Sequence, residues 1–301
     1  MNAKRILGWL LALMLLPLPA GAGSRAESRR KLTVMIYMCG SNLESAYGSA
    51  SADLDEIRAA LSGVPDVTAL VMAGGSEKWS AGYNPELCSF IEIGARGTRT
   101  IRTEDRKSMG SGETLAELLR KGKEDFPAEN HALILWDHGG GPLEGLCWDE
   151  LFSMDHLTLS ELTGALKEVS FPGGLSWIGF DACLMGSAEV AEALAPYARY
   201  MIASQETEPA AGWDYRFLRE AGEDSDGAET GRRIVDAYFE SQEGSRDLLT
   251  MACVDLSRIG DLSRSLDRFF EPASRKVTAD SFAVFSNNIA RCFDWVSTSA
   301  S

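Results

Sequence analysis

The amino-acid sequence predicts an α/β fold, with a mainly parallel sheet covered by helices on both faces. Short runs rich in aliphatic and β-branched residues recur along the chain, and segments with apolar residues at helical spacing lie between most of them. The runs are almost continuously apolar, which is typical of strands buried on both faces. Because strands that alternate with helices form a layered domain, we expect one α/β domain over residues 32–255.

The expected strands and helices follow one another along the chain. The apolar runs predict strands at residues 32–38, 67–73, 88–93, 132–136, 177–180, 201–204 and 249–254. The periodic segments predict helices at residues 51–61, 113–123, 160–169, 187–195 and 230–241. Ser160 offers an N-cap oxygen, and Glu161 a negative charge, to the free N–H groups of a first turn, so we expect the third helix to begin at Ser160.

The two ends of the chain differ from this pattern. Residues 1–22 have the order of a secretory signal peptide: two basic residues, an apolar run at 6–16, then small residues up to Ala22. That run is shorter than the roughly 20 residues that cross a bilayer, and no cysteine precedes Cys39 to carry a lipid anchor. We therefore expect cleavage after Ala22, secretion, a polar leader over residues 23–31, and a helical C-terminal extension over residues 256–301 with helices at 257–270 and 281–294.

The composition limits the partners of the protein. Its formal net charge of −15 repels nucleic acid and anionic lipid, so we expect neither nucleic-acid binding nor membrane binding after signal removal. The same charge attracts basic peptides, although it is also compatible with a role in solubility alone. The six cysteines form no C-x-x-C unit, so the sequence has no local zinc or redox motif.

One of the three histidines has a position that suits catalysis. His131 begins an expected strand and His156 lies in a polar loop, whereas His138 directly follows the apolar run 132–136 in the sequence WDHGGG. The run should deliver His138 to the carboxyl edge of the sheet, where open α/β proteins place their sites.

A cysteine occupies a matching position. Cys183 follows the apolar run 177–180 in the sequence GFDACLMG, just before an expected helix. Backbone N–H groups and the helix dipole at such a turn lower the pKa of a thiol, although a single cysteine there is also compatible with a small buried hydrophobe. Two strand ends that carry a thiol and an imidazole meet the requirement for a nucleophile and its base.

The glycines after His138 suit the same chemistry. Gly139 has no side chain, so a substrate carbonyl could approach closely, and its N–H could join that of Cys183 as an oxyanion hole. The glycine run is equally compatible with a tight turn at positive φ.

Several motifs together resemble one known family. They are TVMIYMCGS at 33–41, SADL at 51–54, LWDHGGG at 135–141, GFDACLMGSA at 179–188, SQETEP at 204–209 and GWDY at 212–215. In this order they resemble the clostripain family, peptidases with a caspase-like fold. The resemblance covers about residues 32–270.

The resemblance implies an endopeptidase that cleaves after Arg, or Lys, through a thioester acyl-enzyme. Cys183 would attack the peptide carbonyl and His138 would protonate the leaving amine, as a dyad without an assigned third residue. A basic substrate side chain needs a carboxylate in its pocket. Asp181 is the first candidate by its place in the family motif and Asp214 the second, and each could instead cap a turn or helix. Asp137, although adjacent to His138, is expected to be structural.

The resemblance also raises questions of processing and cofactors. Some relatives are cleaved internally between the catalytic pair, but this chain has no Lys or Arg at 139–166, so self-cleavage there is not expected unless the site is Lys167. Some relatives depend on calcium. The acidic residues after His138, at 144, 149, 150 and 155, lack EF-hand spacing, so we expect a solvated loop and no cofactor.

Two other readings compete with a peptidase. A caspase-like protein that binds peptides without cutting them is compatible with the same fold, although the presence of both His138 and Cys183 argues against it. A nucleotide-binding or esterase-type protein lacks support, because no G-x-G-x-x-G, G-x-x-x-x-G-K-[ST] or G-x-S-x-G motif occurs. Zinc binding by Cys147, His156 and Cys183 has no local spacing to support it.

Overall fold

The computed structural model describes residues 30–223, 227–242, 249–278, 281–284 and 286. The expected signal peptide at 1–22, most of the leader at 23–31 and most of the helix at 281–294 lie outside the described residues. Arg30 and Lys31, which we expected in the leader, belong to the first strand. Among the described residues, no helix has the length and apolar character that crossing a membrane requires.

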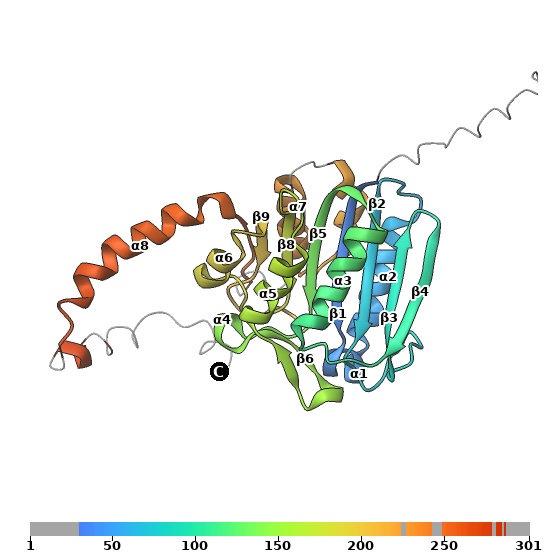
Figure 1. Ribbon diagram of the computed structural model, residues 1–301, viewed down its shortest axis with the longest axis horizontal. Helices are drawn as coiled ribbons and strands as arrows, with labels where there is room; N and C mark the ends of the chain where they lie inside the picture. Colours follow the sequence, from blue (N-terminus) through green and yellow to red (C-terminus); the bar gives the residue numbers. More distant parts are fainter. Residues whose placement is uncertain (1–29, 224–226, 243–248, 279–280, 285, 287–301) are drawn as a thin grey trace, which may run out of the picture.

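One eight-stranded sheet forms the centre of the molecule (Figure 1). Its spatial order is β10-β9-β8-β5-β1-β2-β3-β4. The neighbouring pairs from β9 to β2 are parallel, whereas β10 at one edge and β3 and β4 at the other are antiparallel. The strands are β1 (Arg30–Cys39), β2 (Val67–Gly74), β3 (Leu87–Gly94), β4 (Gly97–Asp105), β5 (Ala128–Trp136), β8 (Leu175–Asp181), β9 (Ala198–Ala203) and β10 (Ala252–Asp255). The predicted mainly parallel α/β fold is confirmed.

Helices cover both faces of this sheet (Figure 1). One face carries α3 (Gly112–Asp125), α5 (Leu159–Val169) and α6 (Ala188–Leu194), and the other carries α2 (Ser49–Leu61) and α7 (Ala228–Ser241). Strand β1 is buried on both sides: Met35 and Tyr37 belong to the first core, and Val34 and Ile36 to the second. This double burial explains why its sequence is apolar without alternation.

Short elements complete the fold. The helices α1 (Ser41–Tyr47) and α4 (Gly141–Glu144) follow β1 and β5. Between α4 and α5 lies a separate hairpin of β6 (Leu146–Asp149) and β7 (Asp155–Leu157). The 3-10 turns are η1 (Glu150–Phe152), η2 (Tyr215–Arg219), η3 (Ala221–Glu223) and η5 (Leu256–Arg258).

Three details differ from the sequence-based expectations. Helix α5 begins one residue earlier than predicted, because Thr158 rather than Ser160 is its N-cap and forms a reciprocal capping box with Glu161. The exposed, polar strand β4 was not predicted, since a charged edge strand lacks an apolar run. The hairpin β6–β7 replaces much of the predicted loop after His138, and its strands are too short to give a periodic signal.

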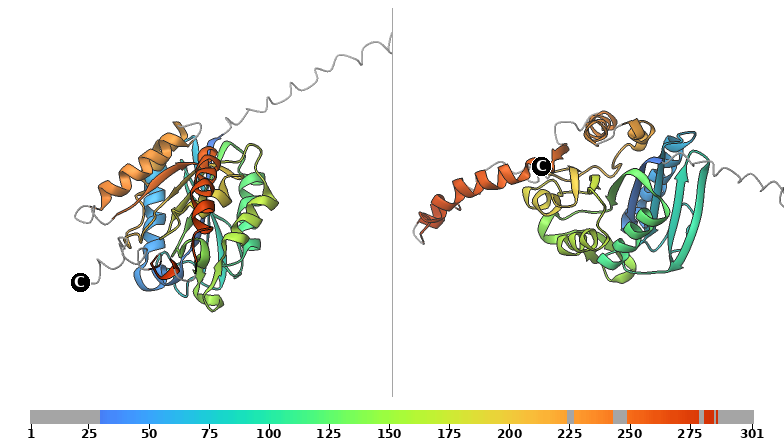
Figure 2. Two further views of the ribbon diagram at one scale, coloured as in Figure 1. Left: turned by 90° about the vertical axis from the view of Figure 1, so that its left-hand side faces the viewer. Right: turned by 45° about the horizontal axis from the view of Figure 1, so that its top comes forward.

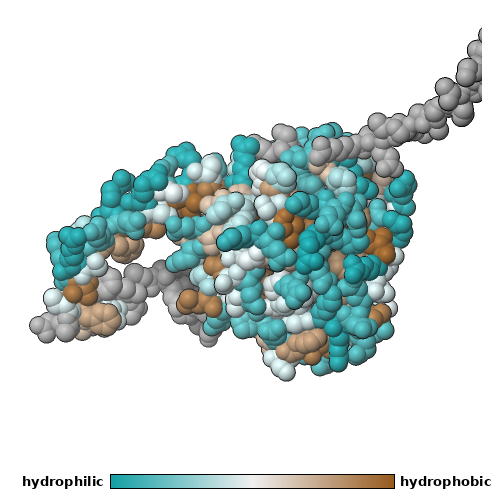
Figure 3. All heavy atoms as spheres, in the orientation of Figure 1, coloured by the Kyte–Doolittle hydropathy of each residue, from teal (hydrophilic) through white to brown (hydrophobic). Residues whose placement is uncertain are grey.

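The last described helix, α8 (Ile259–Ser274), extends away from the sheet (Figures 1 and 2). It confirms the helical pattern predicted at 257–270. Its large apolar side chains Leu262, Phe269 and Phe270 are exposed. The space-filling view shows this extended part of the molecule as mainly hydrophilic, with hydrophobic atoms in between (Figure 3).

Candidate active site

The sheet brings the ends of β5 and β8 side by side. Trp136 and Asp181 are direct partners in the parallel register of the two strands. His138 and Cys183 each follow two residues later, at the same carboxyl edge. Both residues line one pocket of about 240 Å³, as the position of the two apolar runs in the sequence led us to expect.

Gly139 lies directly against the backbone of Cys183. A Cβ atom at position 139 would lie 2.0 Å from the carbonyl oxygen of Cys183, so no other residue fits there without a shift of the backbone. An isolated antiparallel β-bridge pairs Gly139 with Leu146. Its two hydrogen bonds are donated by Cys147 N–H to His138 O and by Gly140 N–H to Gly145 O. That bridge leaves the N–H of Gly139 uncommitted among the described residues. Within the glycine run at 139–141, the residue with a positive φ is Gly141, at 72°, and not Gly139.

The turn that carries Cys183 is held by the segment after β9. Leu184 N–H donates to Glu206 O at 3.1 Å and Gly186 N–H to Ser204 O at 2.7 Å. Leu184 adopts a φ of 66°, a left-handed conformation that is costly for leucine and therefore needs this support. The result is a fixed turn in which the N–H of Glu208 donates to Cys183 Sγ at 3.2 Å.

The expected lowering of the Cys183 pKa does not hold in the free protein. Burial raises the pKa of the thiol, and the hydrogen bond from Glu208 N–H opposes this only in part. Helix α6 begins at Ala188, too far along the chain for its dipole to act on Cys183. Burial also lowers the pKa of His138. Both shifts favour a neutral thiol beside a neutral imidazole.

The ring of His138 is held by a residue that the sequence did not indicate. Its Nε2 lies 2.7 Å from Oδ1 of Asn42, in the first turn of α1. Asp137 faces elsewhere: it is buried, and it accepts hydrogen bonds from Ser41 Oγ and from Trp148 N–H. Burial raises the pKa of Asp137 to about 8.

Asp181 lines the pocket together with three other carboxyl groups, those of Asp53, Asp137 and Glu208. It accepts hydrogen bonds from Tyr215 Oη at 2.8 Å and Trp213 N–H at 3.2 Å, and burial raises its pKa to about 7. Asp53 also lines the pocket and accepts from Trp136 Nε1 at 2.7 Å.

Glu208 is the carboxyl group of the pocket with the fewest hydrogen bonds. Both its carboxylate oxygens are buried and lack a hydrogen bond of normal geometry among the described residues, although the Trp213 side chain and the Ala182 N–H lie close enough to lower its pKa in part. Burial raises its pKa well above the ordinary value, and the neighbouring charge of Asp181 adds to the shift. No Lys or Arg is among the described residues that line the pocket. Glu208 belongs to the SQETEP segment, but only the fold places its side chain beside Cys183.

Asp214, the second candidate for substrate binding, is not among the described residues that line this pocket. Its carboxylate caps η2 through the N–H of Arg216 and also binds the guanidinium of the same residue. Burial alone would raise its pKa, but the hydrogen bonds and charge of Arg216 outweigh burial and lower it. Its geometry is that of a cap, the alternative that the sequence left open.

The acidic segment after His138 is not the solvated loop that we expected. Asp149 is fully buried and accepts hydrogen bonds from Met109 N–H and Leu151 N–H, each at 2.8 Å. Glu150 accepts from Ser45 Oγ at 2.9 Å. These carboxylates are used to fix neighbouring loops. Among the described residues, no group of His, Cys, Asp and Glu side chains is arranged to hold a metal ion.

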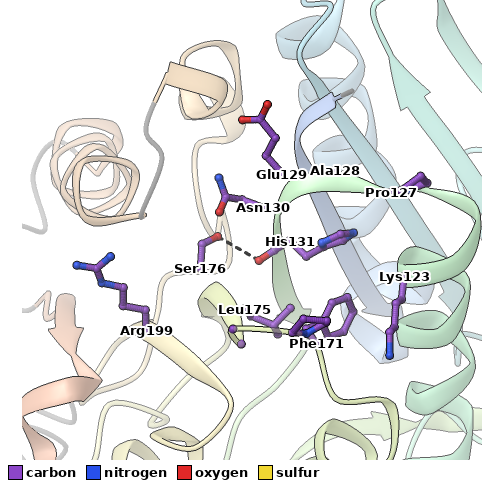
Figure 4. Close-up of a pocket in the computed structure, with 13 residues that line it drawn as sticks. Lys123, Pro127, Ala128, Glu129, Asn130, His131, Phe171, Leu175, Ser176 and Arg199 are labelled. Atoms are coloured by element: carbon purple, nitrogen blue, oxygen red, sulfur yellow. Dashed lines mark hydrogen bonds between the residues drawn. The ribbon is translucent and has the colours of Figure 1, made fainter. Parts of the chain in front are cut away.

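A second cavity, of about 420 Å³, lies at the opposite edge of the sheet (Figure 4). It is formed by the first residues of β5 and β8 with Lys123, Phe171 and Arg199 around them. Lys123 Nζ is already bound to the carbonyl oxygens of Val169 and Ser170, and Ser176 Oγ donates to His131 O. This cavity holds no nucleophile paired with a base, so the smaller pocket is the candidate active site.

Known proteins resemble this chain in sequence. The model of the clostripain family matches residues 36–298. Clostripain of Hathewaya histolytica is 26% identical over 203 residues, which cover 56% of this chain and 36% of that protein. The match therefore spans about a third of the length of that relative.

Solved structures resemble the fold. A secreted C11 cysteine protease from Bacteroides thetaiotaomicron, in complex with an irreversible peptide inhibitor, gives a TM-score of 0.63 at 19% identity, over 78% of this chain and 69% of that one. An inactive zymogen C11 protease from Parabacteroides distasonis gives a TM-score of 0.62 at 24% identity, over 79% of this chain and 65% of that one. At these identities the likeness establishes the caspase-like fold.

Proposed function

The chain belongs to the clostripain family of cysteine peptidases, and on this premise we propose that it is a secreted endopeptidase that cleaves peptide bonds after Arg or Lys. Cys183 is the proposed nucleophile and His138 the proposed base. One observation carries the proposal: a thiol and an imidazole line the same pocket as four buried carboxyl groups, with no Lys or Arg among the described lining residues.

The proposed reaction has two steps. The imidazole of His138 takes the proton of the Cys183 thiol as Sγ bonds to the peptide carbonyl carbon, and the N–H groups of Gly139 and Cys183 stabilise the oxyanion. His138 then gives its proton to the leaving amine, which leaves a thioester. Water attacks the thioester carbon and gives a proton to His138; the C–S bond then breaks, His138 returns the proton to Cys183 Sγ, and the acid product leaves. A lowered pKa suits this role of His138, because the ring is unprotonated at neutral pH.

The substrate preference rests on the carboxyl groups. Asp181 and Glu208 are buried without a cation, and such groups are costly as charges and so favour a ligand that brings a positive charge. Each charge-assisted hydrogen bond from a guanidinium contributes about 1.5–3 kcal/mol. We therefore assign the basic substrate side chain to Asp181 and add Glu208 as a second contact. Proteins and peptides with basic residues are the proposed substrates, and no cofactor is required.

The test is hydrolysis of fluorogenic peptides that end in Arg, Lys, citrulline, Ala or Asp, by reduced protein with and without calcium. We expect release from the Arg or Lys peptides and much less from citrulline, which has the shape of Arg without its charge. Cys183→Ala should abolish release, while Cys253→Ala, which changes a cysteine outside the pocket, should not. Absence of all cleavage by folded protein would favour the alternative, a caspase-like protein that binds peptides without cutting them.

A further inference from the structure

Among the described residues, His138 has one side-chain hydrogen-bond partner, and it is an amide. We propose that Asn42 is the positioning residue of His138: its Oδ1 holds the Nε2–H of the ring, so that Nδ1 is left to exchange a proton with Cys183. This inference rests on the proposed function and adds a third residue to the dyad. The supporting contact is the 2.7 Å distance between Asn42 Oδ1 and His138 Nε2.

The chemistry of the amide determines the state of the ring. A carboxamide oxygen accepts hydrogen bonds and donates none, so Nε2 carries the hydrogen of this contact and the neutral ring keeps its lone pair on Nδ1. When the ring takes up the thiol proton, the same oxygen accepts from a charged donor, and such a bond is stronger than a neutral one. Asn42 therefore favours the protonated ring without adding a negative charge.

The backbone before Asn42 is fixed on several sides. Ser41 is buried, its N–H donates to Gly75 O at 3.1 Å, and its carbonyl accepts from Ser76 Oγ at 2.9 Å. Its φ of 44° lies in the left-handed region, which a serine keeps only when its surroundings hold it there. These contacts hold the start of α1 in one place relative to the sheet.

Two adjacent links join this turn to the end of β5. In the first link Ser41 Oγ donates to Asp137. The residues that follow these two in the sequence, Asn42 and His138, form the second link. The first link is buried and the second is exposed. The buried link thus sets the position of Asn42, and the exposed one acts on the ring that faces the pocket.

No other side chain among the described residues forms a hydrogen bond with the ring of His138. Asp137 is adjacent to His138, but its two oxygens are already bound to Ser41 and Trp148. The titratable groups that line the pocket with His138 are Asp53, Asp137, Asp181, Cys183 and Glu208. Asp53 and Asp181 are held by Trp136 and Tyr215, and the carboxylate of Glu208 lacks a hydrogen bond of normal geometry among the described residues.

The test compares Asn42→Ala and Asn42→Asp with wild type, with Tyr47→Ala as the matched control on the same helix, where the Tyr47 side chain is 75% exposed. For Asn42→Ala we expect kcat on Arg peptides to fall roughly 10- to 100-fold with little change in KM, and the acidic limb of the pH profile, which reports protonation of the His138 base, to move to lower pH. Asn42→Asp keeps an acceptor and adds a charge, so it should recover part of kcat and move the same limb to higher pH.

A second readout does not depend on peptide cleavage. The rate at which iodoacetamide alkylates Cys183, followed by mass mapping of its peptide between pH 5 and 9, should shift to higher pH in Asn42→Ala and stay unchanged in Tyr47→Ala. Unmoved pH profiles and unchanged kcat in folded Asn42→Ala would overturn the proposal. If wild type cleaves no peptide, the proposed function fails, and the alkylation profile still decides the role of Asn42.

Discussion

Two aspartates end neighbouring strands at the same edge of the sheet, yet they have different surroundings. Asp137 follows β5 and Asp181 ends β8, and the N–H of Asp137 donates to the carbonyl of Asp181 at 3.3 Å. Both are buried and both have a raised pKa. The carboxyl group of Asp137 is bound by Ser41 at the start of α1 and by Trp148 in β6, two elements that it joins. That of Asp181 is bound by Tyr215 and Trp213, beside the unsatisfied Glu208.

The difference shows how the same residue type acquires different roles at one sheet edge. Strand register places both carboxyl groups, but the segments that pack onto them decide what each does. Asp137 holds together the turn before α1 and the hairpin after α4. Asp181 contributes to a pocket beside Glu208, whose buried carboxylate oxygens lack a hydrogen bond of normal geometry among the described residues.

The largest expected effect is the loss of preference for Arg peptides when Asp181, rather than Asp137, is changed. Asp181→Asn should lower kcat/KM for Arg peptides about 100-fold, because a buried guanidinium loses a charged partner. Hydrolysis of citrulline peptides should change much less, so the ratio of the two rates is the measurement. An equal loss on both peptides would mean that Asp181 supports the fold of the pocket and not the recognition of charge.

A smaller effect should be seen in the pH dependence of stability. The native pKa values of Asp137 and Asp181, about 8 and about 7, lie above that of an unfolded Asp, so the folded state binds more protons and stability falls as pH rises from about 4 to 7. Each group contributes a slope of up to about 1.4 kcal/mol per pH unit in that window. Urea unfolding should show a shallower slope for Asp137→Asn and for Asp181→Asn than for wild type. Identical slopes for wild type and both variants would refute the raised pKa values of Asp137 and Asp181.

The smallest expected effect concerns Asp214, which the sequence offered as an alternative to Asp181. Because its carboxylate is held by Arg216 and is not among the described residues that line the pocket, Asp214→Asn should change kcat/KM for Arg peptides by less than about twofold. Its effect on stability should be no more than the loss of a cap, about 1 kcal/mol, measured by thermal unfolding. A loss comparable to that of Asp181→Asn would place Asp214 in substrate binding after all.

The sequence by itself determined the layered α/β fold and the positions of His138 and Cys183. Continuous apolar runs follow from burial on both faces, and the residue that follows such a run must emerge at the carboxyl edge of the sheet. This reasoning is local, so it needs only the order of residues within each segment. It fails where the signal is weak, as in the polar edge strand β4 and the short hairpin β6–β7.

Only the tertiary structure decided which side chains surround those two residues. Asn42 meets His138 across 96 positions of sequence, and Tyr215 meets Asp181 across 34. The tertiary structure also places Asp181 in the pocket and Asp214 at the cap of a turn, and the burial of Cys183 raises the pKa of its thiol. Hydrogen bonding and desolvation depend on distances between segments that are far apart in the chain, and no local pattern of residues encodes those distances.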